Sequence, residues 1–422
     1  MHSADEDIFS TEQHDHWHDE RHTELCEPGQ DGGPPAVLCA GTYQYRPRQV
    51  LVESLETKAA ASVANKLTGR GGVPDEEADS TFAHVDLPVR SFLMPHDVHI
   101  PSLVAELRRG DEDGSRLNIA PNHVFGGEPE YHGGPAGEPR SAKPFSESAF
   151  SPAGTEAGTE PPTIAVLDTG YDQAAQTLHP GLATRLDLAG CEPEDAVLPT
   201  GYLAREGGHG TFISGIIMRV APQARIRQVG VLTPAGVTDD RTVALELARA
   251  ARDGIGVINL SLGGYTNHDE PPLAMALTLT HLTNDVAIVA AAGNNRRVRP
   301  FWPAAFKRVV SVGALDTRDG EIRRASFSNH GWWVDVYAPG VRILSTYLQG
   351  IWKLPSEHEP RSIDGFAYWS GTSFAAPQVA AMIASKVPAA GSARQAVLQV
   401  LAEANWVPGL GPVLIPDPGV VG

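Results

Sequence analysis

The second half of the chain alternates short apolar runs with segments of helical periodicity. Six of these runs are continuous rather than alternating: TIAVLDTG (163–170), RIRQVGVL (225–232), GVINLSLGG (256–264), VAIVAAAGN (286–294), VVSVGAL (309–315) and WVDVYAPG (333–340). Continuous apolar runs that end in a turn are typical of parallel strands buried on both faces. Helix-like segments lie between several of them, at 210–218, 240–254 and 271–284. We therefore expect an α/β domain over residues 163–422, with a parallel sheet between two layers of helices.

An earlier region, residues 46–125, predicts a separate and smaller unit. Strand-like segments lie at 48–55, 82–94 and 116–125, and helix-like segments lie at 56–67 and 97–110. The middle strand-like segment supplies one or two strands, because Pro88 interrupts it. The resulting order, strand–helix–strand or strands–helix–strand, predicts a small α+β unit of the ferredoxin-like, split βαβ kind.

Two further regions lack apolar periodicity. Residues 1–45 are acidic and rich in histidine, which predicts a disordered tail. Residues 126–162 are dominated by Gly, Pro, Ser, Glu and Ala, which predicts a flexible, exposed linker that is open to proteolysis. The tail histidines offer metal ligands, but no Cys or His completes a standard zinc spacing, so we expect a solvated tail and no metal site. These histidines are His14, His16, His18 and His22.

Composition narrows the classes of partner. The chain has 33 Lys and Arg against 51 Asp and Glu, a net charge of −18, which argues against nucleic acid as a partner. No apolar run approaches the roughly 20 residues that span a bilayer, so we expect no membrane association. The N-terminus lacks the basic and apolar regions of a secretory signal, and three cysteines are too few for a disulfide framework. These features favour a reducing, cytoplasmic location, and we expect a monomer.

A polar residue stands at one end of each of three predicted strands or helices in the second half of the chain. Asp168 ends the first apolar run, His209 begins a helix-like run, and Ser373 begins another within SGTSFAAP. Taken alone, each has an ordinary interpretation as a turn, a loop residue or a helix cap. Together they provide a nucleophile, a base and a carboxylate that orients the base, the groups that acyl transfer requires. The three lie 41 and 164 residues apart, so only the fold can bring them together.

A fourth polar residue, Asn294, follows the run VAIVAAAG. A carboxamide at a strand end can donate to the oxyanion that forms when a serine attacks a carbonyl. The alternative is a turn-forming asparagine with a local side-chain bond.

The blocks around these residues resemble those of the subtilisin-like serine proteases, or subtilases. VLDTG, GHGT, SLGG, AAGN and GTSFAAP stand in that family's order between residues 163 and about 405. The resemblance implies that Asp168 orients and stabilises, His209 acts as general base and then acid, and Ser373 is the nucleophile. It also implies an oxyanion hole made of the Asn294 side chain and the backbone N–H of Ser373.

The same resemblance implies a substrate cleft around SLGG. Ser261, Leu262 and Gly263 would pair with the backbone of a peptide as an added strand, and Gly264 and Gly293 would shape the pocket for the residue before the cut bond. The predicted substrate is therefore a protein or peptide, and the predicted activity is that of a serine endopeptidase.

The small unit at 46–125 resembles the family's N-terminal inhibitor-type propeptide. Such a unit chaperones the protease domain, and its last segment, here APNHVF (120–125), lies in the cleft until it is cleaved. This implies a self-inhibited zymogen with its own prodomain as a partner, processed in or near residues 126–162. The alternative is an unrelated N-terminal interaction domain.

The sequence also departs from the family pattern. Many subtilases carry a calcium-binding loop after the helix that begins with the catalytic histidine. Here GIIMRVAPQARI (215–226) runs almost directly from helix to strand without a cluster of Asp or Asn. We therefore expect no calcium at that place and no required cofactor. Phe212, Phe374 and Gln378 replace residues that are common in the family, at positions that should not alter the mechanism.

Competing interpretations concern the activity itself. A single Asp-Thr-Gly also opens the active-site loop of aspartic proteases, but that chemistry needs a second carboxylate, and no second Asp-Thr-Gly exists here. An inactive subtilase fold used as a binding or scaffolding module is a further alternative, which the complete set of four residues opposes. A third is a dedicated processing protease kept inside the cell.

Pro377 lies inside the helix-like run that begins at Ser373. We expect it in the first turn of that helix, where it costs no hydrogen bond.

Overall fold

The computed structural model describes residues 37–54, 58–109, 118–127, 139–146, 161–282, 285–353 and 359–416. Its centre is a ten-stranded sheet whose main path runs in the order β19-β20-β16-β14-β13-β11-β7-β9-β8, with β15 paired to β14. The strands are β7 (Thr163–Asp168), β8 (Leu186–Asp187), β9 (Arg225–Gly230), β11 (Val257–Leu260), β13 (Ala287–Ala291), β14 (Val309–Asp316), β15 (Arg323–Arg324), β16 (Val336–Pro339), β19 (Asn405–Val407) and β20 (Gly411–Val413). From β8 to β20 every neighbouring pair on this path is parallel. The predicted α/β fold with a parallel sheet is confirmed.

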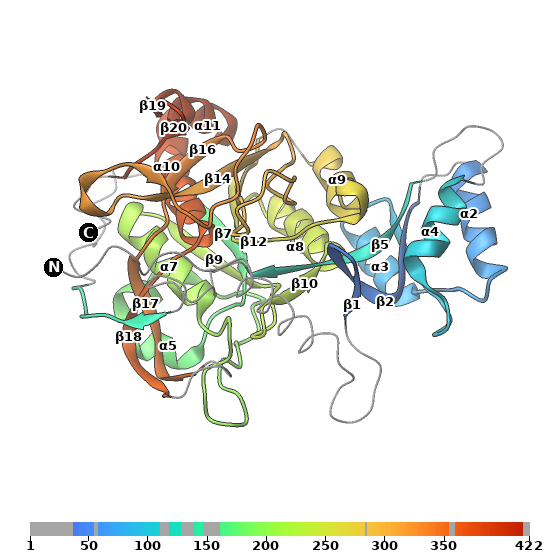
Figure 1. Cartoon of the computed structure of the whole chain (residues 1–422), viewed down its shortest axis with the longest axis horizontal. Helices are drawn as coiled ribbons and strands as arrows, with labels where there is room; N and C mark the ends of the chain where they lie inside the picture. Colours follow the sequence, from blue (N-terminus) through green and yellow to red (C-terminus); the bar gives the residue numbers. More distant parts are fainter. Residues whose placement is uncertain are drawn as a thin grey trace.

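Helices cover both faces of this sheet, as Figure 1 shows. Alternate residues of one strand face opposite sides, so Ile164 and Val166 of β7 join one apolar cluster and Ala165 and Leu167 join another. The first cluster includes residues of α7, α10 and α11, and the second includes residues of α8 and α9. The helices of this part are α5 (Gln173–Leu178), α6 (Pro180–Ala183), α7 (His209–Val220), α8 (Asp240–Arg252), α9 (Leu273–His281), α10 (Thr372–Ala390) and α11 (Ala393–Ala402). Two 3-10 turns lie at Asn267–Asp269 and Arg318–Gly320.

A three-stranded antiparallel sheet lies beside α7. It has the order β17-β18-β6 and consists of β17 (Ile343–Trp352), β18 (Arg361–Trp369) and β6 (Arg140–Ser141). β6 falls within residues 126–162, which the sequence predicted to be a linker without structure. Its two exposed residues pair with Ala367 and Tyr368, just before the helix that carries Ser373.

The N-terminal unit is an antiparallel sheet covered by helices. Its elements are β1 (Leu38–Ala40), β2 (Tyr43–Glu53), α2 (Lys58–Thr68), β3 (Val73–Pro74), α3 (Glu76–His84), β4 (Val89–Leu93), α4 (Ile100–Arg109) and β5 (Ile119–Gly127). The order β5-β2-β4-β3 is that of a split βαβ sandwich, with α2 and α4 packed on one face. The opposite face lies against α8 and α9 of the larger domain.

Two predicted boundaries and one predicted element of this unit differ from the structure. β1 and the start of β2 fall within residues 1–45, predicted as a tail, because buried Val37, Tyr43 and Tyr45 pack into the unit. β5 continues two residues beyond the predicted end at 125. Part of the segment 82–94, predicted as strand, belongs to helix α3, whose N-cap is Asp75. Residues 1–36, with the four tail histidines, lie outside the described residues.

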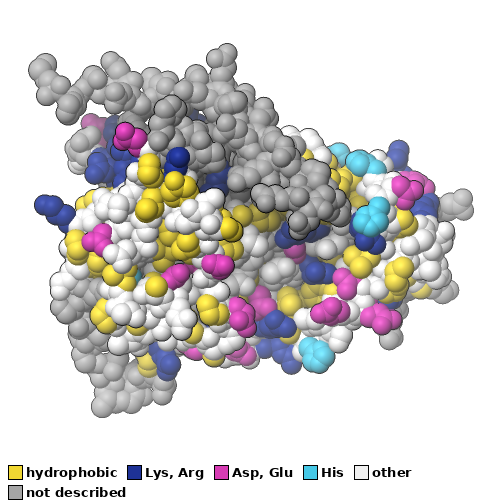
Figure 2. Space-filling view, turned by 90° about the horizontal axis from the view of Figure 1, so that it is seen from below, with side chains coloured by type: hydrophobic (Ala, Val, Ile, Leu, Met, Phe, Trp, Pro, Cys, Tyr) yellow, Lys and Arg dark blue, Asp and Glu magenta, His cyan; other side chains and the backbone are white. Residues whose placement is uncertain are grey.

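One strand joins the two parts of the molecule. β5 pairs antiparallel with β2 in its own unit, and its last residues pair antiparallel with β10 (Val237–Asp239) and β12 (Leu262–Gly263) of the larger domain. In Figure 1, β5 points from the N-terminal unit toward β10 and β12. On the described part of the face in Figure 2, acidic and basic side chains are interspersed across both parts.

Candidate active site

The polar residues singled out in the sequence gather at the carboxyl ends of the central parallel strands. Asp168 is the last residue of β7, and Asn294 follows β13 by three residues. His209 is the first residue of α7, and Ser373 is the second residue of α10. In parallel sheets this edge is where ligands bind, since strand ends and helix starts converge there.

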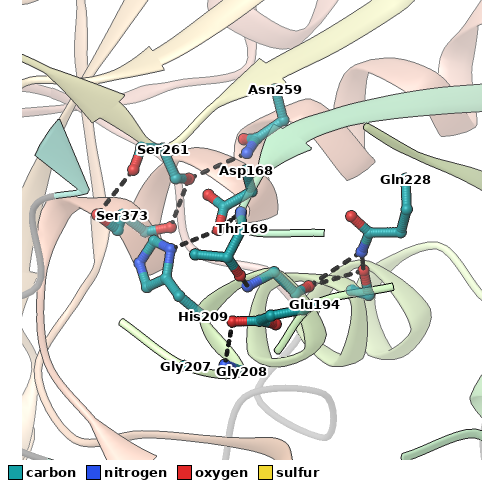
Figure 3. Close-up of polar contacts among 12 residues, drawn as sticks. Asp168, Thr169, Glu194, Gly207, Gly208, His209, Gln228, Asn259, Ser261 and Ser373 are labelled. Atoms are coloured by element: carbon teal, nitrogen blue, oxygen red, sulfur yellow. Dashed lines mark hydrogen bonds and ion pairs between the residues drawn. The ribbon is translucent and has the colours of Figure 1, made fainter. Parts of the chain in front are cut away.

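The structure places the carboxylate against the imidazole. Asp168 Oδ1 lies 2.7 Å from His209 Nδ1, and both side chains are fully buried. The backbone N–H of Thr169 donates to the same oxygen at 2.8 Å, and the hydroxyl of Thr169 accepts from Gly210 N at 3.1 Å. Figure 3 shows this chain of contacts, which ties the end of β7 to the start of α7. Asp168 therefore fixes Nδ1 as the protonated ring nitrogen and leaves Nε2 on the side of the ring away from the carboxylate.

The surroundings of His209 favour the charged ring. Burial lowers the pKa of His209, but the charge of Asp168, its hydrogen bond and the charge of Glu206 outweigh it, so the pKa is raised. The rings of Trp369 and Phe374 lie 5.6 Å and 5.4 Å from the imidazole, centroid to centroid. Nε2 is buried and has no hydrogen-bond partner among the described residues. An oriented imidazole with one free nitrogen is suited to accept a proton.

Ser373 is held by a reciprocal contact with Ser261. The hydroxyl of Ser261 donates to the backbone carbonyl of Ser373 at 2.8 Å, and the hydroxyl of Ser373 donates to the carbonyl of Ser261 at 3.4 Å. Asn259 Nδ2 donates to the Ser261 hydroxyl at 3.0 Å. Figure 3 shows that the Ser373 hydroxyl bonds to Ser261 and not to His209. Catalytic hydrogen bonds are often absent or long without substrate and tighten when it binds.

Because residue 377 is a proline, the Ser373 carbonyl lacks its helical donor, and the Ser261 hydroxyl supplies a donor instead. Helix α10 begins at Thr372, so Pro377 is its sixth residue, and the prediction that it lies in the first turn is wrong. At this position a residue other than proline would donate its N–H to the carbonyl four residues earlier, which is that of Ser373. The Ser261 hydroxyl donates to that carbonyl instead.

Asn294 is oriented for donation. Its Oδ1 accepts from the backbone N–H of Thr372 at 2.9 Å and from the Thr372 hydroxyl at 3.0 Å. Its Nδ2 is buried and has no partner among the described residues. Both donors of Thr372, its N–H and its hydroxyl, are thus directed at Asn294 Oδ1. The amide N–H₂ of Asn294 is thus left for a ligand.

The predicted cleft residues lie around strand β5. Gly263 pairs with Gly126 and Leu262 pairs with Gly127, as a substrate strand would. A Cβ on Gly264 would come within 2.7 Å of the Phe125 ring, so glycine there permits the close approach. Gly293, just before Asn294, has φ of 92°, a backbone conformation that favours glycine.

Sequence reasoning missed two buried acids near His209. Glu194 Oε1 accepts from the N–H of Gly208, the residue before α7, at 3.0 Å, and burial raises the pKa of Glu194 to about 8. Glu206 is also fully buried, and its charge acts on His209. Glu206 stands only three residues before His209, so its place in the sequence could have marked it as a neighbour of the imidazole. Glu194 lies in an acidic stretch far from the motifs, and nothing in the sequence distinguishes it.

Two other features, a metal-binding cluster and a membrane-spanning helix, are absent from the described ranges. No group of three or more His, Cys, Asp or Glu among those residues is arranged to hold a metal ion. In the same part of the chain, no helix is both long and apolar enough to cross a bilayer.

A buried Asp–His pair, a serine at a helix start and an oriented carboxamide are the parts of an acyl-transfer site. The profile of the Subtilase family matches residues 160–403, more than half of the chain. The chain therefore belongs to the subtilase family.

Individual relatives agree with this assignment. A "Thermophilic serine proteinase" of Bacillus sp. (strain AK1) is 35% identical over 237 residues, 54% of this chain and 52% of that protein. Thermitase of Thermoactinomyces vulgaris is 34% identical over 249 residues, 56% of this chain and 78% of thermitase. The chain thus spans about half the length of the Bacillus proteinase.

A solved structure supports the fold over most of the chain. Fervidolysin from Fervidobacterium pennivorans, described as a keratinolytic enzyme related to subtilisin, matches with a TM-score of 0.57 at 20% identity. The match covers 90% of this chain and 61% of that chain, so it extends well beyond residues 160–403.

Proposed function

We propose that this chain is a serine endopeptidase that hydrolyses peptide bonds through an acyl-enzyme on Ser373. The observation that carries the proposal is a pair of buried, unpartnered polar atoms, His209 Nε2 and Asn294 Nδ2, at the site that holds Ser373. Buried polar groups are nearly always hydrogen-bonded, so two such atoms together support a site that is completed by a ligand.

The proposed steps use these atoms in turn. The Ser373 hydroxyl attacks the carbonyl carbon of the substrate, and its proton passes to His209 Nε2, while Asp168 stabilises the resulting imidazolium. The oxyanion accepts hydrogen bonds from Asn294 Nδ2 and from the backbone N–H of Ser373, which lies in the first turn of α10 and has no acceptor within the helix. Collapse breaks the C–N bond, and the imidazolium protonates the leaving amine. Water then repeats the sequence on the ester and restores Ser373.

A fluorophosphonate probe tests the nucleophile. We expect the probe to label the wild type on Ser373, and we expect Ser373→Ala to lose both labelling and peptide hydrolysis. The control is Ser385→Ala, because Ser385 lies on the same helix and its hydroxyl only donates to Ala381 O and accepts from Gln223. Equal labelling of the Ser373→Ala protein would refute the assignment, and a wild type that neither labels nor cleaves would favour a silent binding module.

We further propose that residues 37–127 are an inhibitory prodomain of this enzyme. Support comes from β5, whose residues Val124–Gly127 pair with β10 and β12 in the manner of a bound peptide. Burial of Phe125 against Gly264 anchors that strand. A peptide occupying the cleft in this way excludes other substrates.

Ion pairs between the two parts support the same proposal. Arg46 of β2 lies 2.8 Å from Asp239 of β10, and Arg241 of α8 lies 2.8 Å from Asp75, the cap of α3. The N-terminal unit supplies the arginine of the first pair and the larger domain supplies the arginine of the second, so the two surfaces are complementary in charge. The mostly buried Asp239 has its pKa lowered: burial opposes the charged form, and Arg46, the Thr242 N–H and Arg241 together outweigh it.

Mass spectrometry of freshly folded protein tests self-processing. We expect the wild type to be cut in or near residues 126–162 and the Ser373→Ala protein to remain whole. An uncut wild type with full activity toward added peptides would contradict the prodomain proposal while leaving the peptidase proposal intact.

A further inference from the structure

The space beside the oxyanion amide is filled by an aromatic ring of the chain itself. Phe301 is fully buried, and its ring lies between the backbones of Gly263 and Gly293. A Cβ added to Gly263 would come within 2.2 Å of Phe301 Cε1, and a Cβ added to Gly293 would come within 3.0 Å of Cδ1 and Cγ. Both glycines are therefore needed to leave room for the ring.

Phe301 is held firmly in this place. Tyr265 packs edge-on against it, with ring centroids 5.3 Å apart. The Tyr265 hydroxyl donates to Asn295 Oδ1 at 3.2 Å and accepts from Asn329 Nδ2 at 3.3 Å. Asn329 Nδ2 also donates to the carbonyl of Ala292 at 2.8 Å, on the strand end that leads to Gly293. A ring fixed by its neighbours on several sides does not swing away at low cost.

The Phe301 ring lies near the position expected for the substrate residue that precedes the cleaved bond. The carbonyl under attack must lie between Ser373 Oγ and Asn294 Nδ2. Continuing the observed register, in which Gly126 pairs with Gly263 and Gly127 with Leu262, the next residue of a substrate strand lies opposite Ser261. β11 and β13 are neighbouring strands, so the segments that follow them, 261–263 and 292–294, lie side by side and would flank the side chain of that residue.

We propose that Phe301 makes this pocket shallow, so that the enzyme selects glycine, alanine or serine immediately before the cleaved bond. The inference rests on the proposed peptidase function and adds the substrate class. Gly263 and Gly293 form two walls, and the Phe301 ring takes up the depth between them. A large side chain would have to displace a ring whose surroundings are close-packed, which costs more than its burial returns.

The test is the ratio of kcat/KM for two quenched fluorescent peptides, Val-Phe-Gly-Gly-Ala and Val-Phe-Gly-Gly-Phe, each followed by the same leaving segment. The first four residues repeat Val124–Gly127, so both peptides can adopt the register of β5. We expect the wild type, assayed after the self-processing proposed above, to prefer alanine by at least about 100-fold, since pockets distinguish a single methylene group by about 10–200-fold. Phe301→Ala should reverse this preference, and Phe301→Leu should give an intermediate ratio.

A matched control separates the pocket from general loosening. Phe306 is another aromatic residue of the same segment, half-buried against Trp302 with ring centroids 4.5 Å apart, and Phe306→Ala should keep the wild-type ratio. The ratio is measured within one preparation, so partial misfolding of a variant does not change it.

The results that would overturn the pocket proposal differ from those that would overturn the peptidase proposal. A wild type that cleaves the phenylalanine peptide as well as the alanine peptide overturns the pocket proposal and leaves the peptidase intact. So does a Phe301→Ala variant with an unchanged ratio. If neither peptide is cleaved in a Ser373-dependent way and the fluorophosphonate does not react, the peptidase proposal fails and the pocket proposal fails with it.

Discussion

The contact between Ser261 and Ser373 predicts an energetic coupling between Ser261 and Pro377, which lies four residues after Ser373 on helix α10. Ser261→Ala removes the hydroxyl that donates at 2.8 Å to the buried carbonyl of Ser373. Leaving a buried acceptor without that donor costs about 1–3 kcal/mol of unfolding free energy. In a Pro377→Ala background, residue 377 regains an N–H directed at the same carbonyl. We therefore expect the cost of Ser261→Ala to fall there by at least about 0.5 kcal/mol.

Thermal unfolding of four proteins measures this coupling: the parent, each single variant and the double variant. All four carry Ser373→Ala, which prevents self-digestion and leaves the carbonyl in place. For a domain of this size each kcal/mol corresponds to roughly 2–4 °C in the midpoint. One scan rate is used throughout, because midpoints of proteins that unfold irreversibly depend on it.

Ser385→Ala provides the control for this cycle. The Ser385 hydroxyl also donates to a carbonyl of α10, that of Ala381, at 3.0 Å. The residue four positions after Ala381 is Ser385 itself and not a proline, so this carbonyl does not lack a helical donor. Its cost should be the same with and without Pro377. If Ser261→Ala also costs the same in both backgrounds, the hydroxyl does not replace the missing helical hydrogen bond and the reasoning fails.

Three other expectations concern the groups around the imidazole. Asn294→Ala should lower kcat by about 10²–10³ with little change in KM, the loss known for the equivalent donor of subtilisin itself, and steady-state kinetics measures it. Glu206→Gln removes a charge that raises the pKa of His209, so the acid limb of the kcat/KM profile should move to lower pH; an unmoved limb would contradict this. Burial raises the pKa of Glu194 from 4.5 to about 8, so the folded state binds this proton more tightly than the unfolded state, and wild-type stability should fall as pH rises through that window. Glu194→Gln keeps an acceptor for Gly208 and lacks that loss, so its unfolding midpoint should exceed that of the wild type at about pH 9 more than at about pH 5.

Much of the larger domain could be predicted from its sequence. A strand such as TIAVLDTG is apolar on both faces because both faces are covered, and this shows directly in the residue pattern. Asp168, His209 and Ser373 could be singled out as candidates because their blocks of small residues are dense and stand in a known order. Their hydrogen bonds could not, because Asp168 and His209 meet only after β7 and α7 are brought to one edge of the sheet.

Other features had no local signal or one that was misinterpreted. The cap Asp75 and the acids after it mark the start of α3, but the segment from Phe82 to Met94 was predicted as one or two strands. Phe301 reads as an ordinary core residue, and its position between two glycine backbones depends on segments far apart in the chain. The role of Ser261 toward Pro377 likewise depends on a contact across 112 residues of sequence.

The helix that carries Ser373, the proposed nucleophile, is also the helix that covers one face of the central sheet. α10 packs against β7, β11, β13, β14 and β16, and its first turn holds Ser373. During synthesis from the N-terminus, β7 and α7 emerge well before α10, so the Asp168–His209 pair can form while the serine is still absent. A chain in this state has an exposed sheet face and lacks Ser373. Completion of the core and arrival of Ser373 are therefore one event, so under the proposed function an unfinished chain cannot yet cut itself or its neighbours.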